Sequence, residues 1–201
     1  MRVLLSVFAF LCLCVPSAPA QDKVKEPSTE REFPSTVSFS YEGKDYTLAV
    51  TGVAVRKKII IKVYGMAHYM QDAGKTTEEE AYKAVLSEGK AKQISLQFVR
   101  DVDNTSIQSA YRDGFKNSVS ETEYGKIQGT VEKFLAYFSS PAKENDTYTY
   151  RWLPGGTVVV IAQGQEKPAL TDPVFARALW TIWFGEDSIV DREDLVEWMI
   201  K

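Results

Sequence analysis

The stretch Thr51-Gly-Val-Ala-Val-Arg-Lys-Lys-Ile-Ile-Ile-Lys-Val-Tyr-Gly-Met-Ala-His-Tyr-Met70 decides how this chain folds. It is rich in β-branched and aromatic residues, which favour extended strands. Its second half alternates between two faces, with Ile59, Ile61, Val63, Gly65, Ala67 and Tyr69 on one and Lys62, Tyr64, Met66 and His68 on the other. The pattern predicts a strand over residues 59–70 that follows another over residues 46–55.

Further strands surround this stretch in the sequence. Residues 36–41 alternate in polarity, and a turn at 42–45 predicts that they form a hairpin with residues 46–55. Residues 93–99 form another predicted strand. Residues 147–153 and 157–163 flank Pro154-Gly155-Gly156, which is typical of a second hairpin.

Helix start signals separate these strands. Thr77 with Glu80 is a capping box that predicts a short helix ending near Gly89. Asp103 or Asn104 is placed to cap the next helix, and apolar residues at helical spacing over 127–138 indicate another. Two helices are expected near the end of the sequence, the first starting at Asp172-Pro173 and stopping at Gly185, the second capped by Asp191.

The order of these elements is strands, helices, strands and helices. That order predicts an α+β fold and differs from the strict alternation of a doubly wound sheet. With 201 residues, one domain over residues 33–201 is the economical interpretation, preceded by a flexible polar lead-in at residues 21–32.

Residues 1–20 have the pattern of a signal peptide. Arg2 precedes a run of apolar or small residues from Val3 to Val15, and Ala18-Pro19-Ala20 resembles a cleavage site. The run is shorter than the ~20 residues that span a bilayer, so we expect no membrane span. We expect cleavage near Ala20 and a periplasmic or secreted protein. Both cysteines lie within this segment, which leaves no disulfide or thiol chemistry afterwards.

Charge and motifs exclude several function classes. Without residues 1–20, which carry Arg2 and no acidic residue, 23 basic residues stand against 27 acidic ones, and this net charge of −4 argues against bulk affinity for nucleic acid or an anionic membrane. We find no G-x-S-x-G, Walker or G-x-G-x-x-G motif, so we expect no cofactor. His68 is the one histidine, which leaves no H-E-x-x-H zinc site, and we expect no metal. A buried structural role for His68 is the simpler interpretation, although a role in a pocket stays open.

Arg56 and Tyr64 are the residues in the stretch 51–70 that suit an acidic, apolar ligand. A guanidinium fork binds a carboxylate, and a phenol can share the hydrogen bonding. In one unbroken strand the two residues would lie roughly 26 Å apart. A shared site therefore requires a turn near Arg56-Lys57-Lys58; without one, the basic residues are a solvated turn and Tyr64 is a surface aromatic.

The chain resembles the chalcone isomerase-like family, particularly its bacterial branch. The resemblance is carried, in order along the chain, by Gly52-Val-Ala-Val-Arg-Lys-Lys58 with Lys62-Val-Tyr-Gly-Met-Ala-His-Tyr-Met70, then Phe98-Val-Arg-Asp-Val102, Tyr150-Arg-Trp-Leu-Pro-Gly-Gly-Thr157 and Phe175-Ala-Arg-Ala-Leu-Trp-Thr-Ile-Trp-Phe-Gly185. It implies an open-faced β-sandwich, in which a layer of helices covers an antiparallel sheet with a cleft between them.

The family resemblance implies two alternative functions. Some members bind fatty acids without catalysis, and others are isomerases that close a chalcone to a flavanone by intramolecular addition. Arg56 matches the arginine that holds the anionic oxygen in the enzymes, whereas Tyr64 stands where the enzymes carry threonine and is similar to the fatty-acid-binding members. Tyr111 is the candidate for a third ligand-binding residue.

We therefore expect non-catalytic binding of a fatty acid or similar apolar acid in the cleft, with the carboxylate held by Arg56 and Tyr64. A chalcone isomerase-type lyase is the alternative. A third possibility is a protein-contact domain that uses Trp180, Trp183 and Trp198 as anchors, although burial in the core suits the first two better.

Overall fold

The computed structural model describes residues 22–201, so the expected signal peptide at residues 1–20 lies outside the described residues. The strands are β1 (Lys23–Lys25), β2 (Glu32–Pro34), β3 (Thr36–Tyr41), β4 (Lys44–Lys58), β5 (Ile61–Met70), β6 (Lys92–Phe98), β7 (Thr147–Leu153), β8 (Thr157–Ala162), β9 (Gln165–Glu166) and β10 (Leu170–Thr171). The helices are α1 (Glu78–Leu86), α2 (Asn104–Ser118), α3 (Glu121–Ala136), α4 (Pro173–Phe184), the 3-10 turn η1 (Asp194–Val196) and α5 (Glu197–Ile200).

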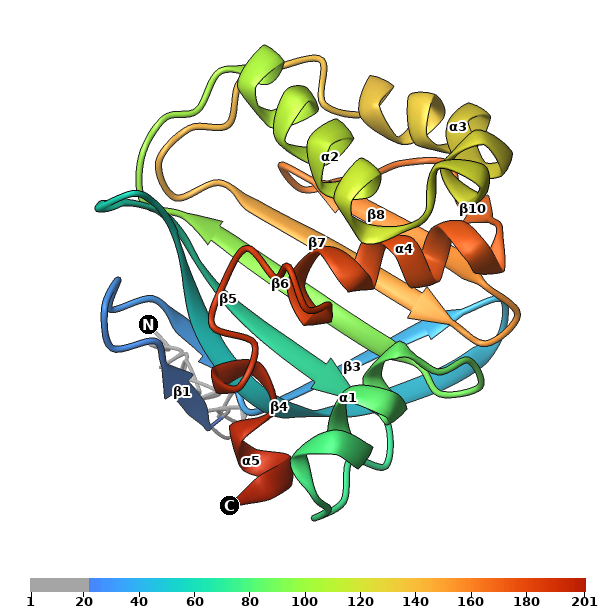
Figure 1. Ribbon diagram of the computed structural model, residues 1–201. Coiled ribbons are helices and arrows are strands. Elements are labelled where there is room, and N and C mark those ends of the chain that lie inside the picture. Colours follow the sequence, from blue (N-terminus) through green and yellow to red (C-terminus); the bar gives the residue numbers. More distant parts are fainter. Residues whose placement is uncertain (1–21) are drawn as a thin grey trace, which may run out of the picture.

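The main sheet is antiparallel throughout and has eight strands. Its order is β10-β8-β7-β6-β5-β4-β3, with β9 paired to β8. Figure 1 shows α2, α3 and α4 together over one face of this sheet. An antiparallel sheet covered by a layer of helices confirms the predicted α+β fold class.

The two faces of the sheet bury different clusters. The helix-covered face is aromatic, with Phe98, Tyr148, Tyr150 and Trp152 packed against Phe115, Phe134, Phe175 and Trp183 of the helices. The opposite face buries a smaller cluster around Leu48, Ala67 and Tyr69. Alternate residues of β5 thus belong to different clusters, as the period of two predicts.

Three of the four predicted helix caps are present. Thr77 accepts a hydrogen bond from the amide of Glu80, and Asp103 accepts one from the amide of Ser106. Asp172 accepts from the first amides of α4, with proline at the first position of the helix. These caps satisfy amide donors that the helix itself leaves without partners.

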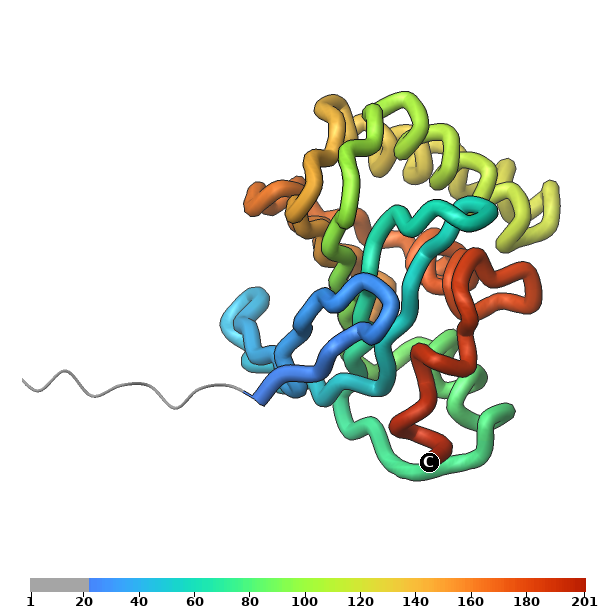
Figure 2. The backbone as a smooth tube through the Cα atoms, turned by 90° about the vertical axis from the view of Figure 1, so that its left-hand side faces the viewer, coloured from blue at the N-terminus to red at the C-terminus, as the bar shows by residue number. Residues whose placement is uncertain are grey.

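Residues 22–32, most of the lead-in that the sequence suggests, contain two short strands. Strands β1 and β2 pair in a small hairpin, which Figure 2 shows in blue over the strands of the main sheet. Its loop closes around the buried carboxylate of Glu26, which accepts from the amides of Ser28 and Thr29 at 2.9 and 2.6 Å. A Cβ atom on Gly65 would lie 2.5 Å from Thr29 Oγ1, so glycine lets this loop pack closely on β5.

The end of the chain differs from the prediction. Asp191 caps no helix; the chain instead forms η1 and the single-turn helix α5. This segment packs against β4, where the carbonyl of Leu195 accepts a hydrogen bond from Thr51 Oγ1 at 2.7 Å. A tertiary contact with the sheet, which no local pattern reports, determines its conformation.

Candidate functional site

Arg56 and Tyr64 lie directly opposite each other on neighbouring strands. The chain turns at Ile59 and Ile60, so that β4 and β5 pair with Arg56 facing Tyr64 in the register. Opposed residues of an antiparallel pair project from the same face of the sheet. The turn that a shared site required is therefore present, next to the basic residues.

The guanidinium of Arg56 is half-buried and bonds to the main chain. Its Nη1 donates to the carbonyl oxygen of Ile189, in the loop after α4, at 2.6 Å. Within residues 22–201 no carboxylate forms an ion pair with Arg56. A partly desolvated cation with a single carbonyl partner retains donors for an anion.

Tyr64 is buried, and its hydroxyl oxygen accepts a hydrogen bond from the indole Nε1 of Trp183 at 3.0 Å. Burial raises the pKa of Tyr64 to about 12, against the opposing effects of Trp183 and Arg56. The phenol is therefore neutral at physiological pH. Because an indole can only donate, the hydroxyl hydrogen of Tyr64 stays available for an acceptor.

Tyr111, on α2, contacts Trp183, the hydrogen-bond partner of Tyr64. Its hydroxyl forms a hydrogen bond with that of Tyr150, its ring stacks on Phe138, and its edge meets Trp183 at a centroid distance of 6.2 Å. Burial raises the pKa of Tyr111 well above its ordinary value. Trp183 thus links Tyr111 to Tyr64, whereas no hydrogen bond joins Tyr111 to Arg56 within the described chain.

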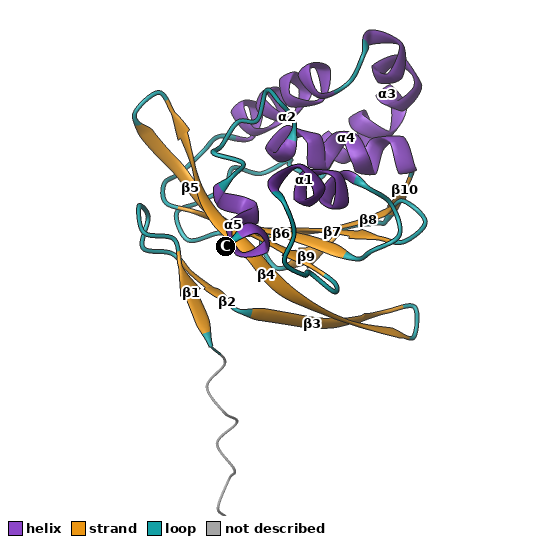
Figure 3. Cartoon of the chain, turned by 60° about the horizontal axis from the view of Figure 1, so that its bottom comes forward, coloured by secondary structure: helices purple, strands orange, loops and turns teal. Residues whose placement is uncertain are grey.

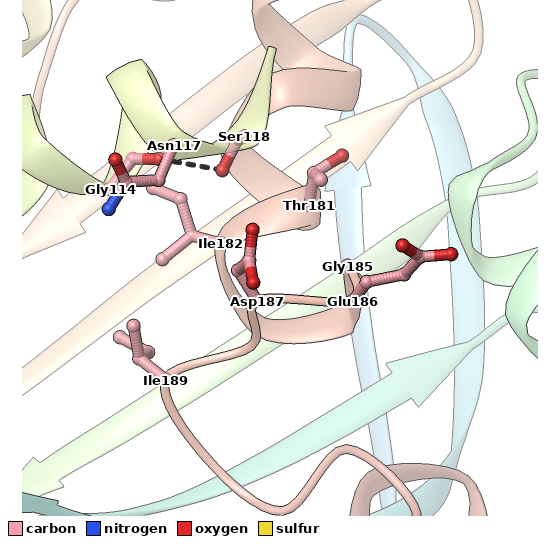
Figure 4. A pocket seen from close by; sticks show the side chains of 9 residues that line it. All are labelled: Gly114, Asn117, Ser118, Thr181, Ile182, Gly185, Glu186, Asp187 and Ile189. Atoms are coloured by element: carbon pink, nitrogen blue, oxygen red, sulfur yellow. Dashed lines mark hydrogen bonds between the residues drawn. The ribbon is translucent and has the colours of Figure 1, made fainter.

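The space behind Tyr64, where the resemblance implied a cleft, is filled by the aromatic side chains between sheet and helices. A cavity of about 230 Å³ lies beside it, between α2 and the end of α4. Figure 4 shows its lining, which comprises Gly114, Asn117, Ser118, Thr181, Ile182, Gly185, Glu186, Asp187 and Ile189. Ile189 also supplies the carbonyl that binds Arg56, so this cavity adjoins the Arg56–Tyr64 pair.

A second cavity, of about 450 Å³, lies on the other side of the same loop. Its walls include Val53, Val55 and Lys57 of β4, which alternate with Arg56 along the strand and project from the opposite face. Several carboxylates also line it, among them Glu26, Asp191 and Glu197. With four carboxylates in its walls, against two in the first cavity (Glu186 and Asp187), this cavity suits an anionic ligand less well.

His68 has the structural role that its isolation in the sequence favoured. It is fully buried, its Nδ1 lies 2.6 Å from Thr51 Oγ1, and its Nε2 accepts from the indole of Trp180 at 3.3 Å. Desolvation lowers its pKa well below 6.5. The ring is therefore neutral, and both of its nitrogens have partners.

Two hydrogen-bond partners of the Arg56–Tyr64 pair were not predicted from the sequence: the indole of Trp183 and the carbonyl of Ile189. Trp183 is buried, as the sequence favours, but its indole also donates a hydrogen bond to Tyr64. The carbonyl of Ile189 could not be found from the sequence, because every residue has a main-chain carbonyl and the residue type does not show which one accepts a hydrogen bond. Trp180 and Trp183 are both fully buried, which removes them as anchors for a partner protein.

No group of histidine, cysteine or acidic side chains within residues 22–201 is arranged to hold a metal ion. The helices described there are also too short or too polar to cross a membrane.

Comparison with known proteins agrees with the fold. Residues 30–195 match the chalcone isomerase-like family, and the chain belongs to that family. A crystal structure of the Arabidopsis thaliana fatty-acid binding protein AtFAP1 superimposes with a TM-score of 0.72 at 18% sequence identity. The alignment covers 88% of this chain and 96% of that one, which shows a shared fold. No curated protein sequence matches.

Proposed function

We propose that the protein binds a fatty acid or a similar apolar carboxylic acid without catalysing a reaction. The observation that carries this proposal is the half-buried Arg56, which faces Tyr64 and has no carboxylate partner within the described chain. Leaving such a cation without an anion is costly, and a ligand carboxylate would compensate it. The fold shared with a fatty-acid binding protein supports the same class of ligand.

The two side chains would share the carboxylate. Arg56 would donate from its guanidinium in a charge-assisted hydrogen bond, and Tyr64 would donate its hydroxyl hydrogen while Trp183 holds its oxygen. Tyr111 would act indirectly, because its ring packs against Trp183 and so helps to hold the indole that binds Tyr64. This assignment gives each candidate residue a separate role.

The apolar chain of the ligand would enter the cavity beside Ile189, between α2 and α4. At about 230 Å³ the cavity is smaller than the roughly 300–1,000 Å³ of typical ligand pockets. A Cβ atom on Gly114 would lie 3.1 Å from Ile182 Cδ1, so the two helices are closely packed there. Binding would therefore move α2 and α4 apart, and longer acyl chains would require a larger movement.

Titration calorimetry with dodecanoate and with dodecanol tests the proposal. We expect dodecanoate to bind with a stoichiometry of one and dodecanol to bind at least roughly tenfold more weakly, because a charge-assisted hydrogen bond contributes about 1.5–3 kcal/mol. Arg56→Ala should abolish this preference for the acid, and Tyr64→Phe should reduce it.

Arg192→Ala is the matched control. Arg192 is also half-buried and donates to a main-chain carbonyl, that of Phe184, but its guanidinium lies over the ring of Tyr82 on α1. Equal binding of acid and alcohol by the native protein, or equal losses in the Arg56 and Arg192 variants, would refute the carboxylate site. Turnover of a chalcone by the same preparation would favour the isomerase alternative instead.

We further propose that binding takes place outside the cytoplasm, in the bacterial secreted branch that the sequence resembles. The support is the signal-peptide pattern of residues 1–20. Amino-terminal sequencing of the protein from fractionated cells tests this proposal, with a start near Gln21 in the periplasmic or secreted fraction as the expected result. An intact start in the cytoplasmic fraction would contradict it.

A further inference from the structure

The turn between β4 and β5 exposes three consecutive isoleucines. Ile59 is 91% exposed, Ile60 85% and Ile61 50%, and no other large apolar side chain of residues 22–201 is exposed. We call this segment the isoleucine tip. Figure 3 shows the β4–β5 hairpin extending beyond the rest of the sheet, with the tip at its far end. Contiguous apolar side chains at a protruding point indicate a contact surface.

The isoleucine tip is also flanked by positive charge. Arg56, Lys57, Lys58 and Lys62 surround it, with no acidic residue between positions 56 and 62, in a chain whose formal net charge is −3. Lys57 and Lys58 are exposed and form no ion pair within the described chain. Lys62 donates to the carbonyl of Ser28 and lies near Glu30. The charge along residues 56–62 is therefore opposite in sign to that of the whole chain, and Lys58 directly precedes the tip, whereas Lys57 also lines the acidic second cavity.

The turn itself does not require isoleucine. Ile59 has a φ of 60°, in the left-handed region that disfavours β-branched residues and that glycine or asparagine adopts at lower cost. An apolar, β-branched residue that is both strained and exposed reduces stability and solubility. Such an outlier supports a role in contact with another surface.

We propose that the isoleucine tip inserts into the interfacial layer of an anionic lipid bilayer, with the flanking lysines on the lipid headgroups. Apolar insertion and attraction to anionic lipid both strengthen such peripheral binding. A second copy of the chain fits this surface less well, because tip-to-tip contact would bring the lysines of both copies together. The attachment does not depend on the proposed ligand, but it places Arg56, roughly 10 Å along β4 from Ile59, beside the membrane.

Sedimentation with vesicles tests this proposal. The protein is used from residue 21 onward, because residues 3–15 are themselves apolar, and this chain keeps every element that the structure describes. We expect binding to vesicles of phosphatidylcholine with phosphatidylglycerol, decreasing with added salt, and weak binding to phosphatidylcholine alone. Ile59→Ser with Ile60→Ser, and Lys57→Gln with Lys58→Gln, should each weaken binding by roughly tenfold or more.

Lys126→Gln with Lys133→Gln is the matched control, since it removes the same charge from exposed positions on α3. Absence of binding by the native protein, or equal weakening by the control and tip variants, would overturn the proposal. A second result would also overturn the proposal. If sedimentation velocity shows that the native protein is a dimer and the isoleucine variant is a monomer, a second copy of the chain covers the tip. Circular dichroism of each variant verifies folding.

Dodecanoate binding, measured in the same variants, separates this proposal from the ligand site. The isoleucine variant should lose its binding to vesicles and retain its binding to dodecanoate. If the native protein binds vesicles but not dodecanoate, the membrane proposal holds and the ligand proposal fails. The converse result refutes the membrane proposal alone.

Discussion

The indole of Trp183 on α4 donates its hydrogen to the hydroxyl oxygen of Tyr64 on β5 across 3.0 Å, inside the buried layer between sheet and helices. This hydrogen bond ties the side chain of Tyr64 to a residue of the helix layer. It also determines which of its two hydrogen-bonding functions Tyr64 can offer a ligand. The orientation of the Arg56–Tyr64 pair therefore depends on how α4 packs on the sheet.

We predict that Tyr64→Phe lowers the free energy of unfolding by about 1–3 kcal/mol, because it leaves the buried indole N–H of Trp183 without a partner. Adding Tyr64→Phe to a Trp183→Phe background should cost less, since that donor is already gone. A double-mutant cycle in urea measures the coupling, expected to be about 1 kcal/mol. Strictly additive effects would show that the hydrogen bond does not stabilise the fold.

A second prediction concerns acid. The pKa of His68 in the folded protein lies well below 6.5 because burial disfavours its charged form. Below about pH 6.5 the unfolded chain binds a proton that the folded chain does not, so stability should fall by up to about 1.4 kcal/mol per pH unit. Urea unfolding between pH 7 and 5 measures this slope, in a window above the ordinary titration of carboxylates.

His68→Gln is the test of the assignment, because its amide can still accept from Trp180 and donate to Thr51. Since His68 is the one histidine in the sequence, this variant should show a flat profile between pH 7 and 5. A slope that persists in the variant would assign the effect to another group.

The sequence predicted most of the fold, because the signals involved are local. Alternation along β5 and the caps at Thr77, Asp103 and Asp172 depend on neighbours within a few residues, and all are present in the structure. The pairing of Arg56 with Tyr64 was conditional on a turn. The lysines marked its place, but the strained conformation of Ile59 that makes the turn had no local signal.

The parts that escaped prediction depend on long-range contacts. The lead-in packs against Gly65, and the last residues pack against β4, so neither conformation follows from its own composition. The aromatic filling behind Tyr64 is likewise a property of the assembled layers. A stripe of aromatic residues on each helix predicts burial, but not whether the buried space holds a ligand.

A third prediction concerns the close crossing of the last residues over β4. A Cβ atom on Gly52 would lie 2.0 Å from the carbonyl oxygen of Asp194 and 2.6 Å from the carbonyl carbon of Leu195. Because both contacts are main-chain atoms that cannot rotate away, Gly52→Ala should displace η1 and cost roughly 3 kcal/mol of unfolding free energy.

Gly125→Ala is the opposite control. Gly125 lies within α3, and an added Cβ atom there would meet nothing within 4 Å. Alanine should therefore raise the free energy of unfolding by about 0.5–1 kcal/mol through its better helix propensity. Chemical denaturation of both variants measures the contrast, and equal effects would contradict the close crossing at Gly52.

The last prediction concerns alkaline stability. Lys92 is fully buried, with Nζ 4.0 Å from the ring centroid of Trp152 and hydrogen bonds to the carbonyls of Ser87 and Lys90. Burial lowers the pKa of Lys92 to about 8, although Glu88 opposes the shift. Between about pH 8 and the unfolded value near 10.4, the unfolded chain holds more protons than the folded chain, so the free energy of unfolding should rise by roughly 2 kcal/mol.

Buried tyrosines produce the opposite slope at higher pH. The pKa values of Tyr64 and Tyr148 are raised to about 12, so above about pH 10 the folded chain keeps protons that the unfolded chain loses, and stability falls. The profile should therefore peak near pH 10. Lys92→Met should remove the rise between pH 8 and 10 and keep the later fall, as measured by urea unfolding at successive pH values. If the variant retains the rise, its origin is not Lys92.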